Sequence, residues 1–284
     1  MTYRSYMSYM SYMSYVLCYY QTMIIGYDGS RAFSHQRTGT ENYSYQLLRA
    51  LSEIDLTNSY YIYLRPGTAP PTDWPANFRF KVLAYPRLWT QVGLSLQTFK
   101  DPLDVLFIPA HTLPLIRKPG LKTVITVHDL GAEYLPITHQ LKQRLYLHLM
   151  THFQLRSASR LIAVSKATKS DLISRLQLSS AKIRVVYEGY NQLLKPVKGD
   201  ALDSVLRHYD IKKDRYFLFV GTIQPRKNLT RLITAFANTP TRCVLVLAGG
   251  KGWLSEEIYQ LPKKLGISDQ VKFLGYVPDQ HLSA

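Results

Sequence analysis

The sequence predicts an α/β protein of two domains, each built on a doubly wound parallel sheet. Three observations lead to this fold class. Short apolar runs rich in β-branched residues alternate with segments that carry apolar residues at helical spacing. A polar stretch interrupts this alternation once. The length of 284 residues is also enough for two domains of ordinary size.

The first domain is expected over residues 23–195 and begins with a strand at Ile24–Asp28. Further brief, apolar strands are predicted at Tyr60–Leu64, Phe80–Ala84, Val105–Ile108, Thr123–Val127, Leu161–Val164 and Ile183–Tyr187. Helices are predicted between them at Glu41–Ile54, Gln140–Leu155 and Lys166–Leu176. The last helix follows Ser165, whose hydroxyl suits the capping of a first turn.

A second set of strands follows a polar boundary. The segment Asn191–Tyr209 carries Pro196 and Gly199 and has no strand pattern, so the domain boundary is placed there. The second domain is expected over residues 205–284. Its strands are predicted at Tyr216–Val220, Val244–Ala248 and Val271–Leu274.

Residues 1–22 differ from the rest of the chain. The tripeptide Ser-Tyr-Met recurs from Ser5, Ser8 and Ser11, a period that matches neither an amphipathic helix nor a strand. Polar residues interrupt any apolar run and no small-residue cleavage site follows, which argues against a signal peptide. We therefore expect this low-complexity segment to have no folded structure, and we hypothesise that translation starts at Met23.

Composition narrows the function classes. The chain has 35 Lys and Arg against 19 Asp and Glu, a net charge of +16, which favours anionic partners such as nucleotide-sugars, acidic lipids or nucleic acid. The two cysteines, Cys18 and Cys243, fit neither a disulfide framework nor a metal site. A cytoplasmic location is expected. Peripheral contact with the inner face of the membrane is compatible with it. No run of about 18 apolar residues is present to cross a membrane.

The strongest functional signal is an apolar strand that ends in a glycine turn followed by two cations. Gly221 and Thr222 follow the strand, and Arg226, Lys227 and Asn228 come shortly after. Asn228 is expected to cap the amphipathic helix that follows, which would leave both cations beside backbone N–H groups and a positive helix end. Such a corner suits a phosphate or a diphosphate. A solvated basic turn is the alternative explanation.

Four further segments of the sequence lie N-terminal to this corner. They are Ile24–Asp28 with Arg37–Glu41, then Val127–Leu130, Ala163–Lys166 and Val185–Gly189. Together with the corner, they resemble the motifs of glycosyltransferase family 4, the group 1 enzymes with the GT-B fold. The resemblance covers most of the chain after Met23 and implies two Rossmann-like domains that face each other.

The resemblance also implies a reaction. A sugar would pass from a nucleotide-sugar donor to an acceptor hydroxyl on a glycan or a lipid-linked precursor, with retention of the anomeric configuration. The nucleotide-sugar is a substrate, and neither a metal nor a cofactor is expected. By this resemblance Arg226 and Lys227 would neutralise the departing diphosphate. His128 would contact the donor sugar, and Asp129 would orient His128 or the acceptor.

Glycines complete the predicted donor site. Gly39 and Thr40 open a helix after the first strand, and Gly249 and Gly250 follow a strand of the second domain. An ordinary strand-to-helix loop is the alternative for the first pair, and a purely structural histidine is the alternative for His128. Many relatives carry Arg after the glycine of the donor loop, where this chain has Thr222. Arg226 is the candidate substitute for that cation.

One motif expected from the family is absent. Its members normally carry Glu-X-Phe-Gly followed by a second Glu, which holds the donor's sugar and ribose, and this sequence has no such segment. The resemblance therefore implies that the second domain is incomplete. We expect a truncated or split gene product, with an inactive remnant or a partner-dependent subunit as the alternative function. A basic surface-binding protein is a further alternative, because one predicted helix carries Lys142, Arg144, His148, His152 and Arg156. Nucleic acid is not an expected partner, since no reader motif accompanies these charges.

Overall fold

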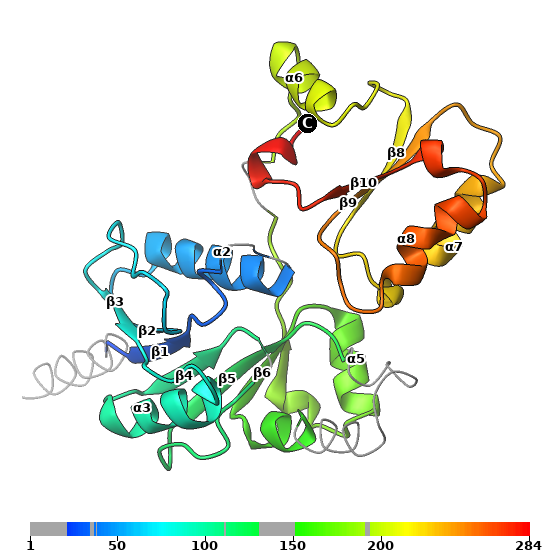
Figure 1. Cartoon of the computed structure of the whole chain (residues 1–284). Helices are drawn as coiled ribbons and strands as arrows, with labels where there is room; N and C mark the ends of the chain where they lie inside the picture. The colour runs from blue at the N-terminus through cyan, green and yellow to red at the C-terminus, as the bar shows by residue number, and fades with distance from the viewer. Residues whose placement is uncertain (1–21, 35–36, 38, 111, 131–150, 191–193) are drawn as a thin grey trace, which may run out of the picture. The chain divides into compact units, whose positions relative to one another are not determined.

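The computed structural model describes residues 22–34, 37, 39–110, 112–130, 151–190 and 194–284 (Figure 1). The Ser-Tyr-Met segment, Cys18, Thr38 and most of the helix predicted at Gln140–Leu155 lie outside these residues, as do Lys142, Arg144 and His148. The chain divides into two compact units, one ending at Gly189 and the other beginning at Tyr190. Each unit has its own parallel sheet, in agreement with the predicted α/β class.

The first unit contains a seven-stranded sheet in the order β3-β2-β1-β4-β5-β6-β7. The strands are β1 (Ile24–Asp28), β2 (Ser59–Leu64), β3 (Phe78–Val82), β4 (Val105–Ile108), β5 (Lys122–Val127), β6 (Arg160–Ala163) and β7 (Ile183–Val185). All neighbouring strands are parallel, and β1 pairs with β2 on one side and β4 on the other. The strand order therefore reverses beside β1, and the carboxyl ends of all the strands meet at one edge, which we call the carboxyl edge.

Helices cover both faces of this sheet. Helix α2 (Gly39–Ile54) lies on one face and α3 (Ser95–Lys100) on the other (Figure 1). A π-helical segment at Trp89–Leu94, which was not predicted, runs directly into α3. Helix α5 (Lys166–Ser174) leads from β6 to β7. Within the described part of the chain, none of the helices is long and apolar enough to cross a membrane.

The two faces of the sheet carry separate hydrophobic cores. Tyr27, Leu48 and Ile62 are fully buried in the core beside α2. Leu106 and Ile125 are fully buried in the core of the other face. Side chains alternate between faces along a strand, which is why apolar runs rather than alternating patterns marked these strands in the sequence.

All the predicted strands of this unit agree with the structure to within two residues at each end. The largest shift is in β3, which covers Phe78–Val82 rather than Phe80–Ala84. Its register explains the difference, because Tyr60 pairs with Phe78 and Leu64 pairs with Val82. The last residue of β2 thus sets the end of the β3 ladder, which closes with a hydrogen bond from the N–H of Leu83 to the carbonyl oxygen of Leu64 at 3.0 Å.

The second unit contains a three-stranded parallel sheet in the order β10-β9-β8. Its strands are β8 (Tyr216–Val220), β9 (Val244–Ala248) and β10 (Val271–Gly275). Its helices are α6 (Asp200–His208), α7 (Leu229–Ala237) and α8 (Glu256–Lys264). The predicted strands are present, but α6 was not predicted and lies within the polar segment in which the boundary was placed. Ile233, Leu247 and Ile258 belong to the hydrophobic core that α7 and α8 form with the sheet.

Candidate functional site

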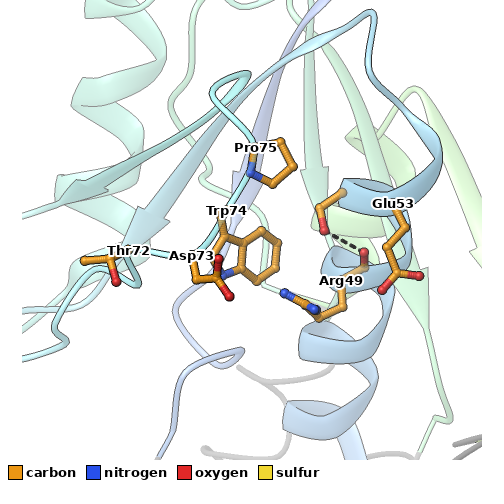
Figure 2. Close-up of a pocket in the computed structure, with 7 residues that line it drawn as sticks. Arg49, Glu53, Thr72, Asp73, Trp74 and Pro75 are labelled. Atoms are coloured by element: carbon orange, nitrogen blue, oxygen red, sulfur yellow. Dashed lines mark hydrogen bonds between the residues drawn. The ribbon is translucent and has the colours of Figure 1, made fainter.

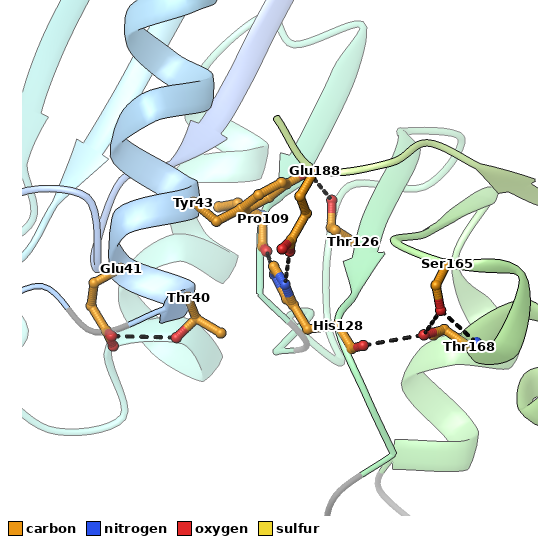
Figure 3. Close-up of polar contacts among 9 residues, drawn as sticks. All are labelled: Thr40, Glu41, Tyr43, Pro109, Thr126, His128, Ser165, Thr168 and Glu188. Carbon is orange, nitrogen blue, oxygen red and sulfur yellow. Dashed lines mark hydrogen bonds and ion pairs between the residues drawn. The ribbon is translucent and has the colours of Figure 1, made fainter. Parts of the chain in front are cut away.

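The carboxyl edge of the first sheet gathers polar residues from several strands (Figure 3). His128 and Asp129 follow β5, Pro109 follows β4, and Glu188 comes shortly after β7. Since the strands are parallel and in register, their ends bring residues together that are distant in the sequence. The structure thus places His128 and Asp129 at the sheet edge predicted for them.

Both ring nitrogens of His128 have a partner (Figure 3). Nε2 lies 2.9 Å from the carbonyl oxygen of Pro109, and Nδ1 lies 2.8 Å from Oε1 of Glu188. A carbonyl oxygen can only accept, so Nε2 carries a hydrogen; Nδ1 donates as well when the ring is an imidazolium ion facing an ionised Glu188. The ring of Tyr43 packs edge-on against His128, with ring centres 4.7 Å apart. These contacts hold the imidazole in one orientation.

The two members of this ion pair differ in accessibility. The side chain of His128 is 12% exposed, whereas that of Glu188 is 44% exposed. A ligand at the carboxyl edge therefore reaches the carboxylate more readily than the imidazole. Beside them, burial raises the pKa of the Tyr43 hydroxyl, the hydrogen bond with Thr126 lowers it, and the charge of Glu188 raises it further. Tyr43 is accordingly a neutral phenol at pH 7.

Helix α5 fixes the main chain at His128. The hydroxyl of Thr168 donates to the carbonyl oxygen of His128 at 3.2 Å. The Ser165 hydroxyl accepts a hydrogen bond from the N–H of Thr168 at 3.0 Å and lies 2.9 Å from the Thr168 hydroxyl. The cap predicted for Ser165 is therefore confirmed, and the bond from Thr168 to His128 joins the start of α5 to the end of β5.

Gly39 and Thr40 form the first residues of α2. The hydroxyl of Thr40 lies 3.4 Å from Oε2 of Glu41, and Oε1 of Glu41 accepts from Arg31 at 3.0 Å. A Cβ atom added to Gly39 would meet nothing within 4 Å. The packing of this unit therefore does not require a glycine there, and the surface above Gly39 is open.

In the second unit, the loops that follow β8 and β9 are bonded to each other. The N–H of Gly221 donates to the carbonyl oxygen of Ala248 at 2.8 Å, and that of Ile223 donates to Gly250 at 3.0 Å. The N–H of Gly252 returns a bond to Ile223 at 2.9 Å. These bonds bring together four residues predicted to bind the donor, namely Gly221, Thr222, Gly249 and Gly250.

Gly249 permits this close approach of the two loops. Its φ angle is +154°, and a Cβ atom there would lie 1.9 Å from the carbonyl oxygen of Gly221. No side chain fits at that distance, so the position requires glycine. A Cβ atom on Gly250 would meet nothing within 4 Å, so Gly250 faces open space.

The two predicted cations lie on the turn that connects β8 to α7. Arg226 and Lys227 are both exposed and belong to the 3₁₀ turn Pro225–Lys227. Cε of Lys227 lies 3.9 Å from the point where a Gly221 Cβ would be, so the lysine side chain lies over the glycine turn. Asn228 occupies the N-cap position of α7, as predicted, but its φ angle is +56° and its side chain makes no capping hydrogen bond. Its left-handed backbone, which Asn tolerates well, redirects the chain into α7 instead.

Sequence reasoning missed two residues of the His128 cluster, Glu188 and Tyr43. A signal for Glu188 was present, since it follows the end of a predicted strand as His128 does. No local signal existed for Tyr43, whose contact depends on how α2 packs across the sheet. Among the described residues, no group of three or more His, Cys, Asp and Glu side chains is placed to hold a metal ion.

Two family models match the chain. The one described as Glycosyltransferase Family 4 matches residues 37–192, and the one described as Glycosyl transferases group 1 matches residues 207–284. Among curated relatives, the O-antigen chain mannosyltransferase B of Escherichia coli is 28% identical over 165 residues, which are 57% of this chain and 43% of that protein. The N-acetylgalactosamine-N,N'-diacetylbacillosaminyl-diphospho-undecaprenol 4-alpha-N-acetylgalactosaminyltransferase of Campylobacter jejuni is 24% identical over 69% of this chain and 50% of its own length. The chain thus spans half or less of the length of these relatives.

Solved structures show the same fold at low sequence identity. Sucrose-phosphate synthase from Thermosynechococcus elongatus matches with a TM-score of 0.67 and 18% identity, over 92% of this chain and 72% of that one. Anabaena Alr3699/HepE in complex with UDP-glucose matches with a TM-score of 0.64 and 17% identity, over 91% and 70% of the two chains. At these identities the likeness concerns the fold alone, and it agrees with the predicted GT-B class.

Proposed function

Because this chain belongs to glycosyltransferase family 4, we propose that it transfers a sugar from a nucleotide-sugar to the hydroxyl of an acceptor. The observation that supports this most directly is the corner of the second unit, where the Lys227 side chain lies over the Gly221 turn. A cation beside a glycine turn suits the diphosphate of such a donor. UDP-glucose, the ligand in the HepE structure, belongs to this class of donor.

In the proposed reaction, the bond between the sugar's C1 and the diphosphate oxygen breaks, and the acceptor oxygen bonds to C1. Retention requires the acceptor to approach from the face that the diphosphate leaves, so the departing phosphate oxygen is placed to take the hydroxyl proton. Negative charge grows on the diphosphate during this step. Lys227 and Arg226 stabilise that charge, without a bound metal.

In the first unit, we propose that the His128 and Glu188 pair contacts the sugar. The imidazole, which has a polar contact at each ring nitrogen, keeps the Glu188 carboxylate in place. The exposed carboxylate accepts a hydrogen bond from a sugar hydroxyl. Asp129, which is exposed at the same edge, orients the acceptor or His128. Gly39 and Thr40 contribute an open surface at the start of α2.

The names of the curated relatives support a proposal for the acceptor class. One acts on an O-antigen chain, and another on a diphospho-undecaprenol carrier. We therefore propose a glycan or a lipid-linked precursor as the acceptor of this chain. A net charge of +16 agrees with transient contact at an anionic membrane surface and with a cytoplasmic location.

A partner-dependent subunit is a second candidate, favoured by the open edge of the second sheet. Strand β8 is at the edge of that sheet, and Leu218 and Val220 are 54% and 56% exposed. An edge strand can pair with a strand of another polypeptide through its backbone, and the exposed apolar side chains of β8 give such a polypeptide a face to cover. In this case activity would appear only when a segment carrying the Glu-X-Phe-Gly motif is added in trans, and a remnant would stay inactive in both conditions.

The deciding experiment is a donor screen. UDP-, GDP- and ADP-hexoses are incubated with the protein and a glycan acceptor, with and without EDTA, and the product's anomeric configuration is read by NMR. We expect one donor to be consumed at a rate that EDTA leaves unchanged, with an unaltered anomeric configuration. If no nucleoside diphosphate binds in calorimetry, the proposed donor site is wrong.

A further inference from the structure

A pocket lies on the first unit, outside the residues proposed for transfer (Figure 2). It has a volume of about 370 Å³. Helix α2 supplies Arg49, Ser52 and Glu53 to one wall, and the segment 72–75 supplies the other. Arg49 is six residues beyond Tyr43 on the same helix, a rise of about 9 Å along its axis. The helix that packs against His128 therefore also forms this pocket.

An aromatic side chain with a fixed position lies at the centre of the pocket lining. Trp74 packs against Phe33, Phe78 and Phe80, with ring centres 6.0, 5.8 and 5.4 Å away. The guanidinium of Arg49 lies 5.4 Å from the centre of the Trp74 ring, within reach of a cation–π contact. Neither the indole nor the guanidinium has to be ordered when a ligand arrives, which favours binding.

The pocket also combines charges of both signs that do not neutralise each other. Arg49 supplies hydrogen-bond donors, whereas Glu53 and Asp73 supply only acceptors when ionised. In the part of the chain that the structure describes, no ion pair joins Arg49, Glu53 or Asp73 to an opposite charge. Donors and acceptors of the lining are thus both available to a ligand.

We propose that this pocket binds a hexose residue of a glycan. Sugar hydroxyls donate to carboxylates and accept from a guanidinium, and the C–H face of the ring is apolar enough to contact an indole. A phosphate would meet the like charges of Glu53 and Asp73, and a simple cation would meet Arg49. A neutral polyol satisfies all three charged groups. The proposal goes beyond the transfer reaction, because binding here needs neither a nucleotide nor catalysis.

The test follows the indole N–H signal of Trp74 by NMR while α-linked mannobiose or maltotriose is added. We expect this signal to shift with a Kd on the order of 1 mM, as is ordinary for a single shallow site. The signals of Trp89 and Trp253 should stay in place, because neither lines the pocket. No movement of the Trp74 signal with either saccharide would overturn the proposal.

Two variants assign the binding to the charged lining. Asp73→Asn and Arg49→Gln should each weaken saccharide binding about tenfold, the effect of one charge-assisted hydrogen bond. Asp269→Asn, a change at an exposed aspartate of the second unit, is the matched control and should leave it unchanged. Equal affinity in all the variants, or displacement of the saccharide by inorganic phosphate, would contradict the proposal. The Asp73→Asn protein should keep its affinity for nucleoside diphosphates. The saccharide proposal and the donor-site proposal can therefore be contradicted separately.

Discussion

Nδ1 of His128 lies 2.8 Å from Oε1 of Glu188, a residue that follows a different strand and is 60 positions later in the sequence. Strands β5 and β7 are separated by β6 alone, so both residues extend from neighbouring points of the carboxyl edge. The pair combines a shielded imidazole with an exposed carboxylate. This arrangement predicts that Glu188 contacts the ligand and that His128 positions Glu188.

Replacing Glu188 by Gln tests this relationship. The amide keeps the shape of the side chain and can still accept from Nδ1 of His128. It loses the negative charge that strengthens the hydrogen bonds with Nδ1 and with the proposed sugar hydroxyl. We expect kcat/KM of the proposed transfer to fall about tenfold or more, and the melting temperature to stay nearly unchanged because Glu188 is exposed. Glu257→Gln on α8 is the control. Unaltered kinetics in the Glu188 variant would show that the pair is only structural.

Local sequence patterns were sufficient for most of the fold. The strands of both sheets are short apolar runs, and such runs mark buried parallel strands without knowledge of their partners. The limits of β3 were misplaced because its ladder ends where β2 ends, a pairing that the β3 sequence does not encode. Helix α3 and the π-helical segment before it were missed because each is only 6 residues long, too short for a clear period.

In the candidate site too, features set by neighbouring residues could be predicted from the sequence, whereas contacts between distant segments could not. The sequence was enough to place Arg226 and Lys227 on a turn shortly after Gly221, because these residues are close together in the chain. The contacts of His128 with Glu188, Pro109 and Tyr43 come from strands and a helix that only the folded sheet brings together. The capping role of Asn228 failed for a different reason, since residue type alone did not show that its backbone is left-handed.

Lys227→Ala should weaken nucleoside diphosphate binding by at least about tenfold and leave the fold intact, because the side chain is exposed and lies over Gly221. If turnover is measurable, losing this cation should raise the barrier by about 2.7–4 kcal/mol, as for other preorganised groups that stabilise developing charge. Calorimetric titration with UDP, GDP and ADP measures the affinity. Lys264→Ala, at the exposed end of α8, is the control for total charge. The same affinity as the wild type for every nucleotide would remove Lys227 from the donor site.

The two glycines after β9 offer a matched pair. Gly249→Ala should lower the free energy of unfolding by about 1–3 kcal/mol, because its Cβ would collide with the Gly221 carbonyl oxygen at a strained φ angle. Gly250→Ala should change it by less than about 1 kcal/mol, since a Cβ there meets nothing. Urea unfolding followed by the fluorescence of the nearby Trp253 measures both. Equal destabilisation by the two changes would contradict the close approach of Gly249 to Gly221 that joins the loops after β8 and β9.

The apolar surface of β8 predicts dye binding. Leu218 and Val220 are separated by one residue, so they share one face of the strand, and both are more than half exposed. An exposed patch of this kind binds hydrophobic probes and promotes association. The double variant Leu218→Ser and Val220→Thr should bind less 1-anilinonaphthalene-8-sulfonate than the wild type and aggregate less at high concentration. Leu88→Ser, at an exposed leucine of the first unit, is the control. Equal dye fluorescence in the double variant and the wild type would place the apolar surface elsewhere.

Asp101 predicts a loss of stability in acid. Burial alone would raise its pKa, but hydrogen bonds from Lys81, Gln97 and Tyr63 lower it more, so the pKa lies below its usual range. The Lys81 ammonium lies 2.5 Å from Oδ1, and the Tyr63 hydroxyl lies 2.7 Å from Oδ2. The folded protein therefore binds fewer protons at this group than the unfolded chain does. Its contribution is fully present above pH of about 4 and disappears as the pH falls through the lowered pKa.

Asp101→Asn should consequently lower the free energy of unfolding by about 1–3 kcal/mol at pH 7, because Lys81 loses its charged partner. The variant should also lose less stability than the wild type between pH 5 and pH 2, roughly the range in which an aspartate titrates. Urea unfolding at a series of pH values measures both effects, with Asp269→Asn as the exposed control. Parallel stability curves for Asp101→Asn and the wild type would mean that the ionisation of Asp101 does not cause the loss of stability in acid. That loss would then have to be assigned to another carboxylate of the first unit, such as Asp55. Burial opposes a low pKa there too, but the hydrogen bonds of Asp55 lower its pKa.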